Sequence, residues 1–128
     1  EQISDFIRKI ALTYLTDTRT AVMLQDLTKQ LTGTNTRASF LAHMLLGASL
    51  RNTKPKKAIA NYEKTLTAIR SITEAQPDDS QNRRDLALSL NFLGGMLCYT
   101  EPSRALGNYQ ESLDIRRGLA QNHPDDRR

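Results

Sequence analysis

Apolar residues recur at three- and four-residue spacing along most of the chain, which is the pattern of amphipathic α-helices. The clearest stripe consists of Ala58, Ile59, Tyr62, Leu66, Ile69 and Ile72. A similar stripe later in the chain consists of Ala105, Leu106, Tyr109, Leu113 and Leu119. Each stripe predicts a helix of about 20 residues, roughly 30 Å long, that buries one face. Both helices should end at a Pro-Asp-Asp sequence, at 77–79 and at 124–126, where the proline stops the helix and an aspartate can cap the next one.

A shorter apolar pattern precedes each of these stripes and predicts a first helix, over roughly 38–51 and again over 84–98. Its leucines share one side with Gly47 or Gly94, and a glycine there allows a neighbouring helix to approach closely. The connection Thr53-Lys54-Pro55 recurs as 100–102. Threonine is a good N-cap and proline is tolerated in the first turn, so we expect the second helix of each pair to begin there.

The second half of the chain duplicates the preceding part. With a shift of 47 residues, 38–81 aligns with 85–128 without a gap, and fourteen of the 44 pairs are identical. The identities fall on apolar and turn positions, among them the Leu-Gly pairs, the tyrosines at 62 and 109 and both Pro-Asp-Asp sequences. The sequence therefore predicts two copies of one antiparallel helical hairpin, at 36–80 and 81–128.

The segment 1–35 precedes the repeats and predicts a long N-terminal helix. Apolar residues keep one helical phase through it, at Ile3, Ile7, Ile10, Tyr14, Ala21, Leu24 and Leu31. No proline or glycine interrupts the segment before Gly33. A kink or break near 16–20 is the alternative, because that polar stretch is a poor helix former. The predicted fold class is therefore all-α.

Composition and charge exclude several function classes. The net charge of +4 comes from 18 basic and 14 acidic residues that are interspersed. The densest basic stretch, at 51–57, is interpreted as a solvated helix end, so no nucleic-acid partner is expected. Apolar runs such as Met44-Leu45-Leu46 are too short to span a bilayer.

No catalytic or cofactor chemistry is predicted for this chain. Cys98 is the single cysteine, so a thiolate metal site is not expected and a half-buried free thiol is the interpretation. His43 and His123 are the only histidines, and we interpret them as a packing or groove residue and a helix-end residue. Phosphate-binding loops and kinase motifs are missing, so we expect no enzyme activity, no cofactor and no metal.

The duplicated positions resemble tetratricopeptide repeats, in the long-helix variety typified by kinesin light chain. The resemblance rests on Leu-Gly at 46–47 and 93–94, an alanine at 58 and 105, a tyrosine four residues later, and a closing proline at 77 and 124. The chain departs from the family where a tryptophan is frequent, at His43 and Leu90. The resemblance implies a right-handed α-solenoid that acts as a protein–protein interaction scaffold and binds a peptide or a partner helix in a concave groove.

The first helix of each pair should line that groove. The predicted groove residues are Met44, Ala48, Arg51, Asn52, Asn91, Gly95, Cys98 and Tyr99. Arg51 can pair with a carboxylate, and the asparagines can bond a peptide backbone. The alternative is that the N-terminal helix or a second copy of the chain fills the groove.

A second resemblance covers the N-terminal segment. Residues 6–11, Phe-Ile-Arg-Lys-Ile-Ala, followed by a repeat pair are similar to the region after the membrane span in bacterial serine/threonine kinases with C-terminal tetratricopeptide repeats. This resemblance implies a sensory or dimerising region, with a homodimer formed through the N-terminal helix and the kinase domain upstream. A free scaffold would be cytoplasmic, whereas the kinase resemblance implies an extracytoplasmic position.

Overall fold

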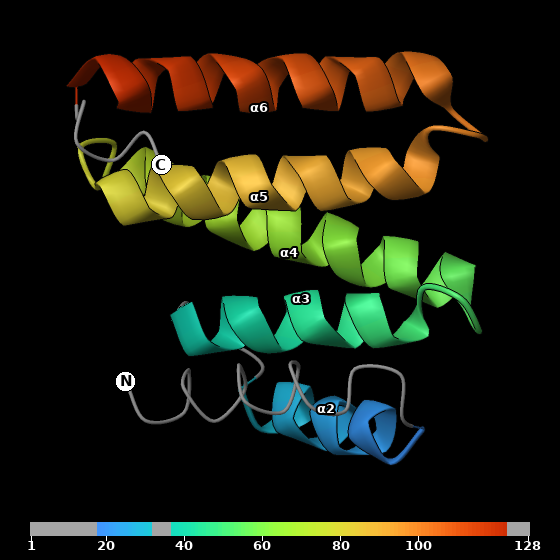
Figure 1. Cartoon of the computed structure of the whole chain (residues 1–128). Coiled ribbons are helices and arrows are strands. Elements are labelled where there is room, and N and C mark those ends of the chain that lie inside the picture. Colours follow the sequence, from blue (N-terminus) through green and yellow to red (C-terminus); the bar gives the residue numbers. More distant parts are fainter. Residues whose placement is uncertain (1–17, 32–36, 123–128) are drawn as a thin grey trace. The chain divides into compact units, whose positions relative to one another are not determined.

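A computed structural model describes residues 18–31 and 37–122 of the chain. Within these ranges the chain forms five helices and no strand (Figure 1). The helices are α2 (Thr18–Leu31), α3 (Arg37–Leu50), α4 (Pro55–Ala75), α5 (Ser80–Leu97) and α6 (Pro102–Asn122). The predicted all-α class is confirmed for this part of the chain. Of the predicted N-terminal helix, α2 is described, and the remainder of 3–31 lies outside the described residues.

The helix boundaries repeat with the period found in the sequence. Helices α4 and α6 are both 21 residues long, and their first and last residues are each 47 positions apart. Helices α3 and α5 end at Leu50 and Leu97, which are also 47 positions apart. The prediction of second helices of about 20 residues is confirmed.

The connection between the helices of each pair is also repeated, down to its backbone hydrogen bonds. Lys54 N–H donates to Leu50 O at 2.8 Å, and Ala58 N–H donates to Lys54 O at 3.0 Å. The equivalent bonds in the second copy are Glu101 N–H to Leu97 O at 2.7 Å and Ala105 N–H to Glu101 O at 3.0 Å. Lys54 and Glu101 thus each donate their N–H to the last residue of the preceding helix and accept with their C=O from the first turn of the next helix.

This geometry corrects the predicted N-caps. Lys54 and Glu101, rather than Thr53 and Thr100, stand immediately before the first helical residue. That residue is a proline in both copies, where its fixed φ suits the first turn and its missing N–H has no intrahelical partner to lose. The proline therefore decides where the helix begins, and the threonine lies one position too early to cap it.

Two compact units make up the chain, residues 1–65 and 66–128. Their boundary falls inside α4.

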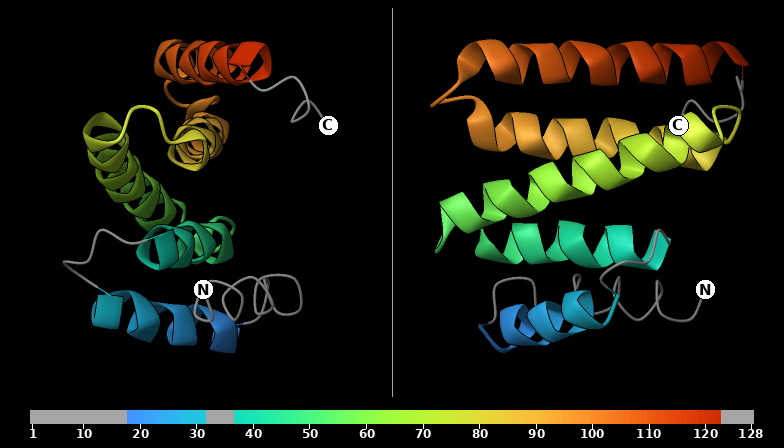
Figure 2. Two further views of the ribbon diagram at one scale, coloured as in Figure 1. Left: turned by 90° about the vertical axis from the view of Figure 1, so that its left-hand side faces the viewer. Right: turned by 180° about the vertical axis from the view of Figure 1, so that it is seen from behind.

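In the first unit, α2 packs beside α3 (Figure 2). Leu24 is fully buried, and Thr28, one turn later on the same face, is 7% exposed. Helix α3 contributes a core of Phe40, Ala42, Met44, Leu46 and Leu50, each at most 5% exposed. Burial of each large apolar side chain contributes roughly 1.5–3 kcal/mol.

In the second unit, α5 and α6 pack against each other along their length (Figures 1 and 2). Leu90, Leu93 and Leu97 of α5 are fully buried. From α6, the Ser112 hydroxyl donates to Ala87 O at 2.9 Å, which satisfies a buried polar group. The start of α5 confirms the predicted role of the Pro-Asp-Asp turn, because Asp79 is its N-cap and accepts from Asn82 N–H at 2.9 Å.

A tyrosine ring packs directly on a glycine in both copies. A Cβ added to Gly47 would lie 2.6 Å from Tyr62 Cε1, and one added to Gly94 would lie 3.1 Å from Tyr109 Cε1. A Cβ at Gly47 would require the ring to shift, and one at Gly94 would be a tight contact, so the predicted close approach at the two glycines is confirmed. The contacts differ in burial, since Tyr62 is 1% exposed and Tyr109 is 39% exposed.

The predicted buried stripe of α6 needs correction. Ala105 and Leu119 are buried, but Leu106 is 57%, Tyr109 39% and Leu113 46% exposed. The buried line instead runs through Ala105, Ser112 and Leu119 at seven-residue spacing. Apolar periodicity located the right helix and missed the polar Ser112 that faces the core.

We predict that alanine substitutions at three glycines separate close packing from helix propensity. Gly47→Ala should lower the free energy of unfolding by about 1–2 kcal/mol, because the Tyr62 ring is buried and overpacking outweighs the propensity gain. Gly107 is exposed with open space around its Cβ position, so Gly107→Ala should raise stability by roughly 0.5–1 kcal/mol. The change in the free energy of unfolding for Gly94→Ala should lie between those for Gly47→Ala and Gly107→Ala. Urea denaturation measures all three, and equal effects at 47 and 107 would contradict the packing argument.

Candidate functional site

The groove residues predicted in the first unit lie at the C-terminal half of α3 and in the following turn. Met44, Ala48 and Arg51 follow one another at intervals of four and three residues, which places them on one helix face. Arg51 and Asn52 are exposed and Ala48 is half-buried. Met44 is 5% exposed and belongs to the core, so a ligand could contact it only after displacing the atoms that cover it.

The groove residues predicted in the second unit occupy the equivalent end of α5. Asn91, Gly95 and Cys98 have the same four- and three-residue spacing and are all half-buried. The Cys98 thiol donates to Gly95 O at 3.3 Å, so it is satisfied within its own helix. Tyr99 is 95% exposed in the turn that follows.

The polar groups near the predicted groove are bonded within their own helix or do not cluster. His43 is half-buried, and its Nδ1–H donates to Ser39 O at 2.8 Å within α3. Within the described ranges, no three His, Cys, Asp or Glu side chains cluster in a way that could bind a metal ion. The predicted helix-end residue His123 and the second Pro-Asp-Asp turn lie outside the described residues.

The phenol of Tyr62 has a shifted pKa in the first unit. Burial of the phenol raises the pKa of Tyr62 to about 12, and the nearby Arg51 charge lowers it by a smaller amount. The exposed guanidinium of the predicted groove is therefore electrostatically coupled to the buried ring that packs on Gly47. The charge of Arg51, a candidate recognition residue, thus acts on Tyr62 in the core of the first unit.

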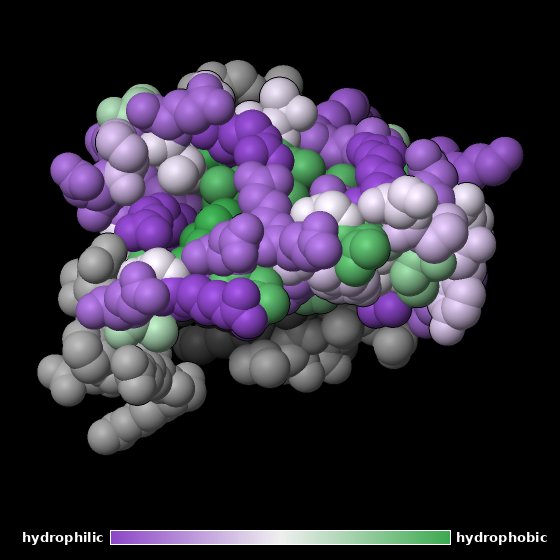
Figure 3. Space-filling view, turned by 90° about the horizontal axis from the view of Figure 1, so that it is seen from above, coloured by the Kyte–Doolittle hydropathy of each residue, from purple (hydrophilic) through white to green (hydrophobic). Residues whose placement is uncertain are grey.

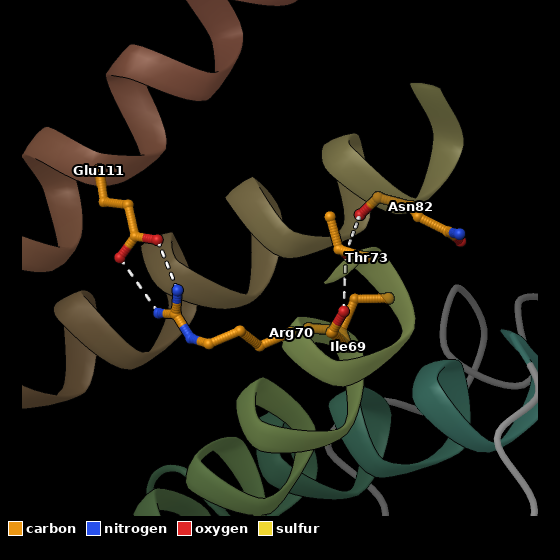
Figure 4. A network of polar contacts seen from close by, with 5 residues as sticks. All are labelled: Ile69, Arg70, Thr73, Asn82 and Glu111. Carbon is orange, nitrogen blue, oxygen red and sulfur yellow. Dashed lines mark hydrogen bonds and ion pairs between the residues drawn. The ribbon is translucent and has the colours of Figure 1, made fainter. Parts of the chain in front are cut away.

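An ion pair that the sequence analysis missed joins α4 to α6 in the second unit (Figure 4). Arg70 Nη1 and Nη2 donate to the Glu111 carboxylate at 2.7 and 3.1 Å, a bidentate geometry. This hydrogen-bonded contact raises the pKa of Arg70. One turn further along α4, the Thr73 hydroxyl donates to Ile69 O at 2.7 Å and lies 3.4 Å from Asn82 O (Figure 4). Arg70 and Glu111 are 41 residues apart, and no local pattern marks them as partners.

Apolar side chains also reach the surface on α6. Leu106, Tyr109 and Leu113 are spaced by three and four residues, and they therefore form one stripe along the helix. Figure 3, which looks down on the side where α6 lies, shows hydrophobic residues at the surface among hydrophilic ones. We call Leu106, Tyr109 and Leu113 the α6 stripe.

None of the described helices is long and apolar enough to cross a membrane. Comparisons of the chain with protein-family models, curated proteins and solved structures found no match.

We predict that stability falls at alkaline pH partly through Tyr62. The pKa of this phenol is about 12 in the folded chain and 10.0 when unperturbed, so the unfolded state loses the proton first. The contribution of this pKa shift to the free energy of unfolding is complete below pH 10 and decreases between pH 10 and about 12. Denaturation at several pH values should show that the free energy of unfolding decreases less between pH 10 and 12 for Tyr62→Phe than for the wild type. Identical pH dependence of the two chains would contradict the assignment.

We predict that the Arg70–Glu111 pair contributes a coupling energy of about 0.5–1 kcal/mol, because both side chains are 40% exposed and solvent screens the charges. A double-mutant cycle with Arg70→Met and Glu111→Gln measures it. The coupling should shrink as the salt concentration rises. The Arg104–Glu101 pair, at 3.6 Å within one turn of α6, is the matched control and should show a weaker coupling. A larger coupling at the control pair would contradict this ranking.

Proposed function

We propose that the chain is a non-catalytic helical-repeat scaffold that binds an extended peptide or a partner helix. In this proposal the pairs α3–α4 and α5–α6 are successive hairpins of a tetratricopeptide-like right-handed solenoid. The observation that carries the proposal is the recurrence of the glycine–tyrosine contact 47 residues apart. Two units that share such a specific contact are best explained as copies of one building block, and stacked copies present equivalent faces to a ligand.

The repeated connections support the same proposal. Equivalent hydrogen bonds around Lys54 and Glu101 connect the two helices of each pair. Proline at the first helical position fixes this geometry in both copies. A scaffold needs such local determinants, because its recognition groups must be presented without reorganisation on binding.

The proposed recognition groups differ in what each would contribute. Arg51 is exposed and would pair with a carboxylate of the ligand, and Asn52 and Asn91 would bond its backbone. Tyr99 would supply apolar area at a low cost in side-chain entropy. Met44 is part of the core and would shape the surface from beneath.

Selection from a displayed random-peptide library tests the proposal. We expect enriched peptides to carry an acidic residue and an apolar one, and Arg51→Glu and Tyr99→Ala each to weaken binding about tenfold or more. Melting temperatures should stay at the wild-type value, since both side chains are exposed. Isothermal titration calorimetry with a selected peptide measures the affinities.

The controls are Lys56→Glu and Leu106→Ala. The first makes the same charge reversal on an exposed residue of the same basic stretch, and the second truncates an exposed apolar residue on α6. Both should leave peptide affinity unchanged. The groove assignment is wrong if the groove variants bind a selected peptide as tightly as the controls do.

A further inference from the structure

The Tyr109 side chain lies across two consecutive glycines of α5. A Cβ added to Gly94 would lie 3.1 Å from Tyr109 Cζ, and one added to Gly95 would lie 3.7 Å from the Tyr109 hydroxyl oxygen. The phenol therefore packs on Gly94 with its ring and reaches Gly95 with its hydroxyl. Gly95 belongs to the predicted groove, so a side chain of α6 brings a polar group to the groove face of α5.

The Tyr109 hydroxyl is available for a hydrogen bond to a ligand. The side chain is 39% exposed, and its hydroxyl forms no hydrogen bond within the part of the chain that the structure describes. Gly95 is half-buried and has no side chain, so a ligand backbone can approach α5 closely at this point. The neighbouring Cys98 thiol already donates to Gly95 O, and it therefore does not compete for the same ligand atom.

Asn91 adds a second polar group on the same face of α5. It lies one turn before Gly95 and is half-buried, and its amide has no hydrogen bond within the described ranges. Four residues of an α-helix advance about 6 Å along the axis. Backbone groups on one side of an extended chain repeat about every 6.5–7 Å. The Asn91 amide and the Tyr109 hydroxyl at Gly95 are therefore spaced along α5 like successive same-side backbone groups of an extended peptide.

The first copy does not have this arrangement. Met44 and Ala48 stand there in place of Asn91 and Gly95, and Met44 belongs to the core. The tyrosine equivalent to Tyr109 is Tyr62, which is only 1% exposed. The glycine–tyrosine contact is thus common to both copies, whereas the partly exposed hydroxyl beside a groove glycine belongs to the second unit.

The chemistry of these two groups favours an extended peptide over a partner helix as the ligand. Most backbone carbonyls of a helix already accept from an N–H four residues later, and only those at its C-terminal end lack such a partner. The C=O and N–H groups of an extended peptide all need partners when they leave water. A phenol can donate to such a carbonyl, and a side-chain amide can both donate and accept.

We propose that the Tyr109 hydroxyl is a ligand-binding group of the second unit, which donates to a backbone carbonyl of an extended peptide where the peptide passes Gly95. The Asn91 amide bonds the same peptide one same-side backbone group away. This inference rests on the proposed function and deepens it, because it selects an extended peptide as the ligand and adds a binding residue from α6.

A tyrosine-to-phenylalanine pair tests the hydroxyl. Isothermal titration calorimetry with a peptide selected from the random library should show about three- to tenfold weaker binding for Tyr109→Phe, because one hydrogen bond is lost. The melting temperature should stay at the wild-type value, since the hydroxyl has no hydrogen bond within the described residues. Tyr62→Phe is the matched control, because it removes the hydroxyl of the buried equivalent ring, and it should leave the affinity unchanged.

A glycine-to-alanine pair tests the access to that hydroxyl. The Cβ of Gly95→Ala would lie in ordinary contact with the hydroxyl oxygen at 3.7 Å, so the chain accommodates it without a shift. It should nevertheless weaken peptide binding about tenfold or more, because the methyl group occupies the place where the peptide backbone approaches. Gly107→Ala, at an exposed glycine of α6, should leave the affinity unchanged. Tyr109→Phe should have little further effect in the Gly95→Ala chain.

A spectroscopic measurement separates direct bonding from an indirect effect. In a chain labelled with ¹³C at the tyrosine Cζ positions, the peptide should shift the Tyr109 resonance and leave the Tyr62 resonance in place. Assignment uses the two phenylalanine variants. A Tyr109 resonance that does not move on saturation with peptide would overturn the proposal.

The affinities also distinguish failure of this proposal from failure of the peptide scaffold. Equal affinities for Tyr109→Phe, Gly95→Ala and their two controls would overturn the proposal, and the scaffold would stand if Arg51→Glu still weakened binding. A selected ligand that gains helical circular dichroism on binding would overturn it in favour of a partner helix. A library that enriches no peptide would overturn it together with the proposed function.

Discussion

The fold depends on contact between a helix backbone without a side chain and a tyrosine ring. A Cβ at Gly47 would collide with the Tyr62 ring, and one at Gly94 would be in tight contact with the Tyr109 ring, so the two glycines allow the helices of each pair to approach closely. The consequences differ between the copies because their burial differs. Tyr62 is removed from water, which raises the pKa of its phenol, whereas Tyr109 is 39% exposed and has room to move. The same glycine–tyrosine contact is therefore enclosed by neighbouring atoms in the first copy and partly open to solvent in the second.

Local chemistry explains which parts of the fold could be predicted from the sequence. Asp79 caps α5 and prolines open α4 and α6, because these effects involve only residues within one turn. The threonine caps were wrong by one residue, since a proline at the first helical position overrides a weaker capping preference. Burial of the α6 stripe was wrong for another reason. The second helices share an apolar pattern, and the pattern cannot show whether a further element covers it.

The proposed groove rests on local spacing in the same way. Met44, Ala48 and Arg51, and likewise Asn91, Gly95 and Cys98, follow one another at intervals of four and three residues. This spacing did not distinguish the buried Met44 from the exposed Arg51, because exposure depends on neighbours from other parts of the chain. The Arg70–Glu111 pair escaped prediction because its members are 41 residues apart and only one of them is repeated. Their pairing is a property of tertiary packing.

That partial repetition also gives the proposed array a direction. Arginine is kept at positions 70 and 117, but the facing position changes from Lys64 in the first copy to Glu111 in the second. A hairpin with the acid can follow an arginine-bearing helix, whereas a hairpin with the lysine would meet a like charge there. Apolar packing alone would not distinguish the two copies, whereas these charges do.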